Sequence, residues 1–367
     1  MGAFDWQIHA ITEAEASAWW TEHPQPTVQI PAKDTTRVQL VALSALLPTG
    51  ALAHAFEVTI PAYGATASHL AAMLRIGANA PATDGLAVPI HWYERHLASN
   101  GLDTELAALL ADSEVVSDPL VRSARLEAFR GALVAAPLEA DFVAALASAL
   151  ATFPSGSLQV ASSTNAEALR GFVGAALAVT RTTDPDDPAR SLELTIKSVW
   201  ASAWSLAAFD ERAYRGIAQA EVGMGLVLTP APAAPAANGL AISANVYDLE
   251  GLEPAFVVDA QTGAASVAAP APGVSHDRIL YYWYYPGQPQ LFLARSSLVA
   301  PGAPVLTNTQ AYQLGRALDA IHTLFAPVHQ AAQTFYGLEV GFAFTGPPGE
   351  TPGLVITSAR PYPGWGP

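Results

Sequence analysis

The sequence predicts an α+β protein of two lobes, in which a mostly helical lobe is followed by a lobe built on a mixed sheet. Helix signals dominate residues 46–157, whereas apolar runs separated by Pro and Gly turns dominate residues 158–367. With 367 residues, of which 51% are hydrophobic, the chain can bury a sizeable core. Residues 1–45 are expected to form an N-terminal extension ahead of the two lobes.

Helices are predicted from their caps and from the spacing of apolar residues. Thr12 and Glu15 form a capping box ahead of a short helix, and Asp118-Pro119 supplies a cap and a first-turn proline for the helix that follows. Pro327 should kink or break the last long helix. The other helices are expected over residues 65–77, 91–101, 139–153, 191–209 and 309–337.

Strands are predicted where short apolar runs lie between turn residues. Such runs cover residues 85–90, 158–162, 222–228, 239–247, 255–261, 265–270, 278–285, 290–297, 338–344 and 353–361. The uncharged segment 229–239, which is rich in Pro and Ala, should form a loose surface loop.

The charge balance limits the class of partner. Only 13% of the residues are charged, the net charge is −15, and Lys33 and Lys197 are the two lysines. We therefore expect neither nucleic acid nor an anionic membrane as a partner. The absence of cysteine excludes disulfides, thiolate metal sites and a cysteine nucleophile. The N-terminus has acids and no basic region before an apolar run, so we expect no signal peptide and a soluble, cytoplasmic protein.

The stretch SSTNAEALRGFVGAA, residues 162–176, resembles a loop that leads from a strand into a helix. Ser162, Ser163 and Thr164 could cradle an anion with hydroxyl and amide groups at that helix. The favoured alternative is that they form a turn and a cap that the fold requires. Glu167 is either an acid or base of a site or the acceptor for nearby amides.

Six blocks of sequence occur in an order typical of one family. They are YGATASHLAAML, SSTNAEALRGFVGAAL, KSVWASAWSLAAFDERAYRGI, ANGLAISANVYD, VLTNTQAYQL with IHTLF, and LEVGFAF with ITSARPY. From about residue 60 to its end, the chain resembles the nucleotide-binding half of phosphoenolpyruvate synthase and pyruvate phosphate dikinase. The resemblance implies an ATP-grasp-like fold whose two lobes enclose a nucleotide cleft.

The resemblance covers the framework and not the charges of that family. A lysine, an arginine and a second arginine of the family are aligned with Thr66, Ala161 and Ala207. These cations would hold a triphosphate, so their loss implies weak nucleotide binding.

The acids that the family places on its penultimate strand are also incomplete. Glu339 keeps the first, Gly341 replaces the second, and Arg360 remains on the last strand. Side chains at i and i+2 of a strand share a face, so that face keeps one carboxylate where a Mg²⁺ site needs at least two oxygen ligands. The resemblance thus implies a vestigial nucleotide cleft formed by Ser162, Ser163, Thr164, Glu167, Glu339 and Arg360.

An aromatic run and the histidines complete the candidate residues. The run comprises Tyr281, Tyr282, Trp283, Tyr284 and Tyr285. On a strand its rings would alternate between faces, so the run is either a buried strand or a wall that binds a peptide or protein partner. The nine histidines show no convincing metal-binding spacing, and His322 and His329 are expected to be structural.

Three functions remain open at this point. The first is a catalytically degenerate ATP-grasp-like protein that needs no cofactor, has no catalytic residue, and binds a peptide, protein or small metabolite in the cleft. It would be a pseudoenzyme and an accessory in a biosynthetic pathway. The second is an active ATP-dependent phosphotransferase or ligase that uses ATP and Mg²⁺ with rearranged ligands. The third is a structural assembly subunit, and homo-oligomerisation is open in each case.

Overall fold

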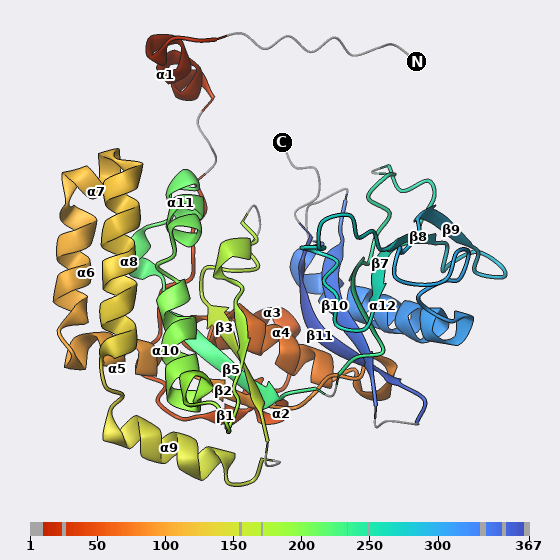
Figure 1. Cartoon of the computed structure of the whole chain (residues 1–367), viewed down its shortest axis with the longest axis horizontal. Helices are drawn as coiled ribbons and strands as arrows, with labels where there is room; N and C mark the ends of the chain where they lie inside the picture. The colour runs from red at the N-terminus through yellow and green to blue at the C-terminus, as the bar shows by residue number, and fades with distance from the viewer. Residues whose placement is uncertain are drawn as a thin grey trace.

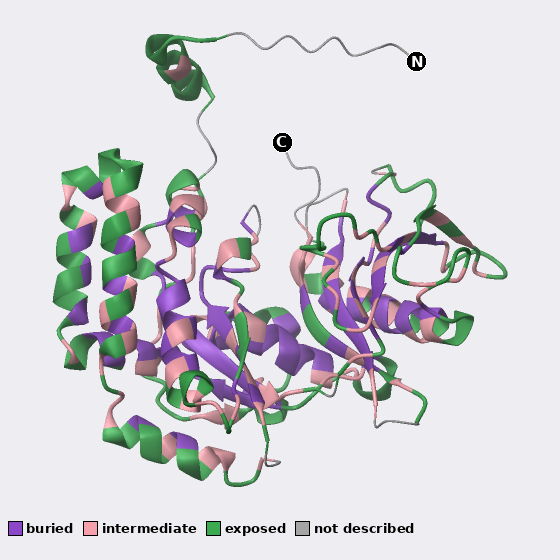
Figure 2. Ribbon diagram, in the orientation of Figure 1, coloured by how far each residue is buried: buried purple, intermediate pink, exposed green. Residues whose placement is uncertain are grey.

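The computed structural model describes residues 10–23, 27–153, 156–169, 172–232, 234–248, 250–330, 335–346 and 350–362. Two antiparallel sheets, each accompanied by helices, form two lobes that lie side by side (Figure 1). The buried residues of both sheets and of the helices packed on them form the interior of each lobe (Figure 2). The predicted α+β class is confirmed.

The first lobe holds a five-stranded sheet in the order β1-β2-β5-β3-β4. Its strands are β1 (Val41–Ala42), β2 (Leu86–Val88), β3 (Leu158–Thr164), β4 (Thr180–Thr182) and β5 (Met224–Pro230). Its helices are α2 (Leu43–Leu46), α3 (Leu52–Tyr63), α4 (Ala65–Leu74), α5 (Ile90–Ser99), α6 (Leu102–Ala111), α7 (Ser113–Ser117), α8 (Pro119–Ala135), α9 (Ala140–Leu150), α10 (Leu192–Ser202) and α11 (Leu206–Tyr214). Trp200 and Trp204 fill the core between the helices and the sheet.

The second lobe holds a six-stranded sheet in the order β11-β10-β6-β7-β8-β9. Its strands are β6 (Ala237–Ile242), β7 (Phe256–Thr262), β8 (Asp277–Tyr281), β9 (Gln290–Ala294), β10 (Leu338–Thr345) and β11 (Gly353–Pro361). Helix α12 (Asn308–His329) packs Leu314, Leu318 and Phe325 into the core that this sheet shares with α3 and α4.

The chain passes from the first sheet to the second between β5, which ends at Pro230, and β6, which begins at Ala237. Strand β2 lies in the segment expected to be helical and pairs with β5, so the first sheet draws strands from both sides of residue 157. Within the described residues, no single helix is long and apolar enough to cross a membrane; α8 and α9 would meet those criteria only as a pair bent by 69°.

Several predicted helices are confirmed. Thr12 and Glu15 make the capping box of α1 (Glu13–Glu22), none of whose residues is buried, and the Asp118 side chain caps α8. The predicted helix 191–209 is instead two helices separated at Ala203–Ser205.

Helix α12 continues through Pro327, which lies in its last turn, and ends two residues later at His329, short of the predicted end at residue 337. The predicted strand over residues 265–270 is wrong, because these residues form bends and irregular structure.

The corner between α3 and α4 fixes how α4 enters the molecule. Gly64 joins the two helices with φ +82°, and a Cβ built on it would lie 2.2 Å from the backbone of Ser163 on β3. Only glycine combines this backbone conformation with such a close approach. Helix α4 then buries eight of its ten residues between the two lobes.

Replacing Gly64 by Ala should therefore destabilise the protein severely. We expect a loss of roughly 3 kcal/mol or more in the free energy of unfolding, because steric overlap adds to the cost of the positive φ. Gly101→Ala is the matched control, since Gly101 has φ +69° with nothing within 4 Å, and it should cost about 1 kcal/mol. Urea unfolding of both variants measures the difference, and equal losses would show that the close approach to Ser163 is unimportant.

Candidate ligand cleft

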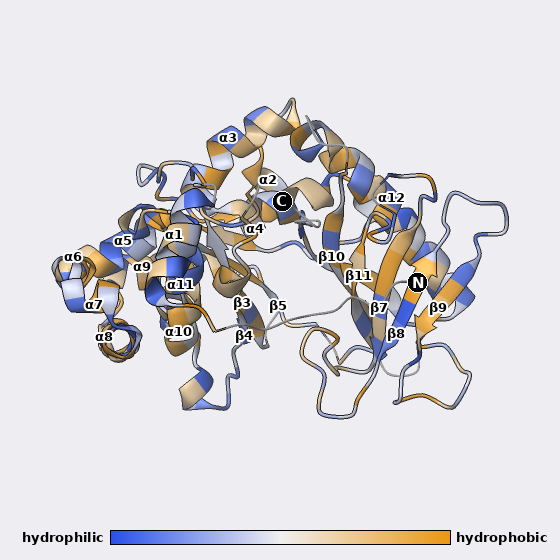
Figure 3. Ribbon diagram, turned by 90° about the horizontal axis from the view of Figure 1, so that it is seen from above, coloured by the Kyte–Doolittle hydropathy of each residue, from blue (hydrophilic) through white to orange (hydrophobic). Residues whose placement is uncertain are grey.

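A cleft of about 650 Å³ lies between the two sheets. Strands β3–β5 and helix α4 form one wall, β6, β10 and β11 form the other, and the segment that links the sheets closes one end. Figure 3 shows β3, β4 and β5 on one side and β10 and β11 on the other. The segment 229–239, expected to be a loose surface loop, contributes Pro230, Ala231 and Asn238 to the lining.

The cleft brings four of the six predicted cleft residues together. Ser162, Glu167, Glu339 and Arg360 line it, as do Thr66, Ala161 and Gly341, the positions where charges of the family were expected. Ser163 and Thr164 are buried and are not among the lining residues. Ala207 is exposed on α11 and does not line the cleft, so its alignment with a phosphate-binding cation has no counterpart in this geometry.

The two serine hydroxyls are engaged in bonds within the chain. Ser162 Oγ donates to Leu177 O at 2.6 Å and accepts from Val179 N at 2.8 Å. Ser163 Oγ donates to Tyr63 O at 2.7 Å and accepts from Ala67 N at 2.9 Å. Both serines lie within β3. The Ser163 bonds hold the strand against the α3–α4 corner, and the Ser162 bonds hold it to residues 177–179.

In the described part of the segment after β3, the expected helix is absent. Residues 165–169 and 172–174 form turns and an irregular segment, and a single 3₁₀ turn follows at Ala175–Leu177. Asn165 accounts for the irregular backbone of this segment, because its side-chain amide donates to Pro31 O at 2.7 Å and to Glu221 O at 3.0 Å. Its Oδ1 accepts from Gly223 N at 2.9 Å. Asn165 thus holds the chain in bonds to distant segments that a helix could not make.

Glu167 places a carboxylate on the wall of the cleft at the N-terminus of α4. Its Oε1 accepts from Thr66 N at 3.0 Å, from Thr66 Oγ1 at 2.7 Å and from Thr164 N at 2.9 Å. Burial raises the pKa of Glu167 to about 6 despite these bonds. At neutral pH the carboxylate is therefore an anion facing the cleft.

Glu339 and Arg360 form an ion pair across neighbouring strands. They lie directly opposite in the β10–β11 register, and Arg360 Nε donates to Glu339 Oε1 at 2.8 Å. Arg360 is the one lysine or arginine among the described residues that line the cleft, and this pairing neutralises it. Arg360 therefore makes an internal salt bridge.

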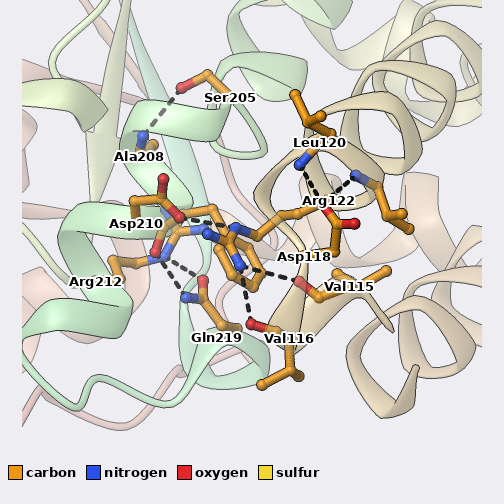
Figure 4. Close-up of polar contacts among 12 residues, drawn as sticks. Val115, Val116, Asp118, Leu120, Arg122, Ser205, Ala208, Asp210, Arg212 and Gln219 are labelled. Carbon is orange, nitrogen blue, oxygen red and sulfur yellow. Dashed lines mark hydrogen bonds and ion pairs between the residues drawn. The ribbon is translucent and has the colours of Figure 1, made fainter. Parts of the chain in front are cut away.

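The half-buried Arg122 and the buried Arg212 lie elsewhere in the first lobe and do not restore charge to the cleft. Arg122 forms an ion pair with Asp210 at 2.9 Å and donates to the carbonyls of Val115 and Val116 (Figure 4). Arg212 donates from Nε to Gln219 at 2.7 Å and lies 5.3 Å from the Trp204 ring, and burial lowers its pKa to about 10. Both arginines hold the helices of the lobe together.

The aromatic run lies away from the cleft. Tyr281 ends β8, and residues 282–285 leave the strand in a turn, so the expected strand over residues 278–285 is wrong for its second half. Trp283 packs on Tyr312 of α12, the Tyr284 hydroxyl donates to Asp319 at 2.9 Å, and Tyr284 and Tyr285 are exposed. None of the five lines the cleft.

A histidine pair beside the cleft was missed by sequence reasoning: His69 is buried and lines the cleft, and His329 is half-buried. His69 of α4 and His329 of α12 have ring centroids 5.6 Å apart, and His69 Nδ1 is 2.9 Å from Ala359 O of β11. Burial lowers the pKa of His69 to about 3 and that of His329 to about 4. No spacing signal could pair residues so distant in the chain. Among the described residues, no group of three or more metal-ligating side chains is present.

The two-sheet fold and the cleft between the sheets define an ATP-grasp-like protein. The family model described as pyruvate phosphate dikinase, AMP/ATP-binding domain, matches residues 60–269, which is more than half of the chain. The chain therefore belongs to this family. The match ends before β8, so the resemblance read from residue 270 onward lies outside it. No curated protein matches the chain.

The histidine pair should make stability depend on pH. In the unfolded chain both imidazoles have ordinary pKa values near 6.5, so the unfolded state binds more protons than the folded state below that pH. The free energy of unfolding should have its full value above about pH 6.5 and should fall as the pH is lowered towards 4. Each histidine should contribute a slope of up to about 1.4 kcal/mol per pH unit. Glu167 opposes this, since its raised pKa favours the folded state as pH falls from about 6 towards 4.5.

His329→Leu should reduce this slope, as measured by urea unfolding at a series of pH values. His54→Gln is the control, because the His54 side chain is 69% exposed, and it should keep the parent slope. If the His329→Leu variant kept the parent's slope of unfolding free energy against pH, the histidine pair would not be the cause of the loss of stability in acid.

Proposed function

We propose that the chain is a non-catalytic member of its family that binds an uncharged or cationic ligand in the cleft. The ligand would be a small metabolite or a segment of a peptide or protein. The observation that carries the proposal is the charge of the cleft walls, where Glu167 and Glu339 face a single cation, Arg360.

This charge pattern does not suit a nucleoside triphosphate. With Arg360 paired to Glu339, the ionised Glu167 leaves the walls with a net negative charge, which repels a polyanion. Thr66 and Ala161 offer no cation, and each missing charge-assisted bond represents about 1.5–3 kcal/mol. At the low end, two such bonds correspond to roughly a hundredfold in affinity.

The walls also lack the ligands that Mg²⁺ requires. Glu339 is held by Arg360, and Gly341 supplies no oxygen beside it. Mg²⁺ in nucleotide sites is held by carboxylates together with phosphate oxygens. Glu339, paired with Arg360, and Glu167, bonded to Thr66 and Thr164, are a poor donor set because both carboxylates are already engaged. The residues present do not fit Mg-ATP, and no phosphoryl-transfer step follows from them.

The remaining lining groups suit a ligand with neutral polar and apolar parts. Thr180, Thr182 and Thr357 offer hydroxyls, Gln159 and Asn238 offer amides, and Val227 and Phe342 offer apolar surface. The volume of about 650 Å³ is in the range of small-molecule sites. A cytoplasmic accessory role in a biosynthetic pathway, with chemistry supplied by another protein, is the setting that this proposal implies.

An active ATP-dependent phosphotransferase or ligase is the second candidate. The family match favours it, because the matched model describes an AMP/ATP-binding domain. It requires cations and metal ligands from a partner chain or from a rearrangement of the lobes.

Mg-ATP should not bind tightly to the purified chain. Because the cleft walls are net negative, we expect isothermal titration calorimetry to show no binding at micromolar concentrations, with or without Mg²⁺. Arg360→Gln serves as a comparison, since it makes the walls more negative and should not bind better. A micromolar, Mg²⁺-dependent dissociation constant for the parent would refute the proposal and favour the active enzyme.

Returning two charges to the walls should restore measurable affinity. Ala161→Arg adds a guanidinium on β3, and Gly341→Glu adds a carboxylate beside Glu339 on one face of β10. We expect the double variant to show a Mg-ATP-dependent thermal shift with millimolar affinity. Its stability should fall modestly, since a Cβ at Gly341 meets the hydroxyls of Ser358 at 2.5 Å and Thr357 at 2.6 Å. A well-folded double variant with no shift would mean that the cleft differs from a nucleotide site in more than charge.

A further inference from the structure

A second pocket of about 460 Å³ lies in the second lobe, at the end of the sheet far from the cleft. Strands β8 and β9, the loops that follow them and the first two turns of α12 line it, and the pocket is open to the surface, where Arg295, Asn308 and Tyr312 are exposed. It shares no lining residue with the cleft. The residues that line it are Tyr281, Gly287, Gln288, Gln290, Phe292, Arg295, Gly302, Pro304, Asn308 and Tyr312.

Arg295 is the one charged residue among those that line this pocket. Its guanidinium lies 3.4 Å from the centroid of the Phe292 ring. Within the part of the chain that the structure describes, its side chain has no carboxylate partner, in contrast to Arg278 on the neighbouring strand, which pairs with Asp259. The chain has a net charge of −15, so an arginine without a carboxylate partner is unusual in it. Because the Phe292 ring holds this guanidinium in place at the pocket, its N–H groups are available to bind an anion.

The remaining walls are aromatic and amide-bearing. Tyr281, Phe292 and Tyr312 present rings, and Gln290 and Asn308 present amides that can donate hydrogen bonds. Gln288 has φ +46°, an unusual conformation for a residue other than glycine, and its Oε1 accepts from the Tyr281 hydroxyl at 3.5 Å. Strained residues of this kind persist where the surrounding structure holds them, as at ligand sites.

We propose that this pocket binds a small aromatic carboxylate. The guanidinium and the amides match the two oxygens of a carboxylate, and the rings match a planar aromatic body. A single cation suits a single negative charge, so a carboxylate is favoured over a phosphate dianion. The proposal does not depend on the function of the cleft.

Benzoate is the probe, measured by saturation-transfer NMR and by titration of the full chain. We expect millimolar or better binding, with benzamide, which lacks the charge, and cyclohexanecarboxylate, which lacks the ring, each at least about fivefold weaker. Arg295→Gln should weaken benzoate about tenfold. Arg316→Gln is the matched control, because Arg316 is an exposed arginine of α12 outside the pocket, and it should bind as the parent does.

Asn308→Asp provides a second test that does not remove the arginine. Asn308 is exposed, and an added carboxylate at the pocket should weaken benzoate as well. Thermal melting of each variant verifies its fold. The proposal is overturned if benzoate gives no saturation transfer, if benzamide binds as well as benzoate, or if Arg295→Gln binds benzoate like the parent.

Discussion

The contact between the α3–α4 corner and β3 positions everything else in the cleft. Gly64 lets the corner approach the Ser163 backbone, and Ser163 Oγ then bonds to both Tyr63 O and Ala67 N. From this point α4 extends between the lobes, bonded to Glu167 of the first lobe through Thr66 and to Ala359 of the second through His69. One buried helix therefore sets the separation of the two walls.

The fold and the ligand place different demands on the same stretch of chain. The fold requires small and polar groups at fixed places, and Ser162, Ser163 and Asn165 meet this demand with bonds inside the chain. A phosphate ligand requires cations on the walls, and Thr66 and Ala161 do not meet that demand. Since the two demands fall on different residues, a family member can keep the cleft while its charge, and hence its ligand, changes. The proposed binding of an uncharged or cationic ligand follows from this separation.

Local chemistry made much of the fold predictable. The capping box of Thr12 and Glu15 and the Asp118-Pro119 start of α8 act within one helical turn, and the structure has both. The same reasoning failed where distant contacts decide the backbone. The segment after Thr164 contains residues that favour a helix, but Asn165 bonds to segments 56 and 134 residues away and holds a turn instead.

The candidate site was predictable only in part for the same reason. The cleft positions Ala161, Glu339, Gly341 and Arg360 followed from the family resemblance, and the structure brings them together. The pairing of His69 with His329 arises from packing between elements far apart in sequence. The pocket around Arg295 is formed within residues 281–312, but no pattern along that segment marks it. The aromatic run made Tyr281 a candidate binding residue, but it gave no indication of the arginine and the amides that line the same pocket.

The central claim is that the cleft disfavours added phosphate charge. It is tested most directly by comparing adenosine, AMP and ATP as ligands of the parent chain by equilibrium dialysis at one ionic strength. Because the walls carry Glu167 and the Glu339–Arg360 pair, each added phosphate should leave the affinity unchanged or lower it. Affinity that rises from adenosine to AMP to ATP would show that the cleft still holds phosphate, and would contradict the account.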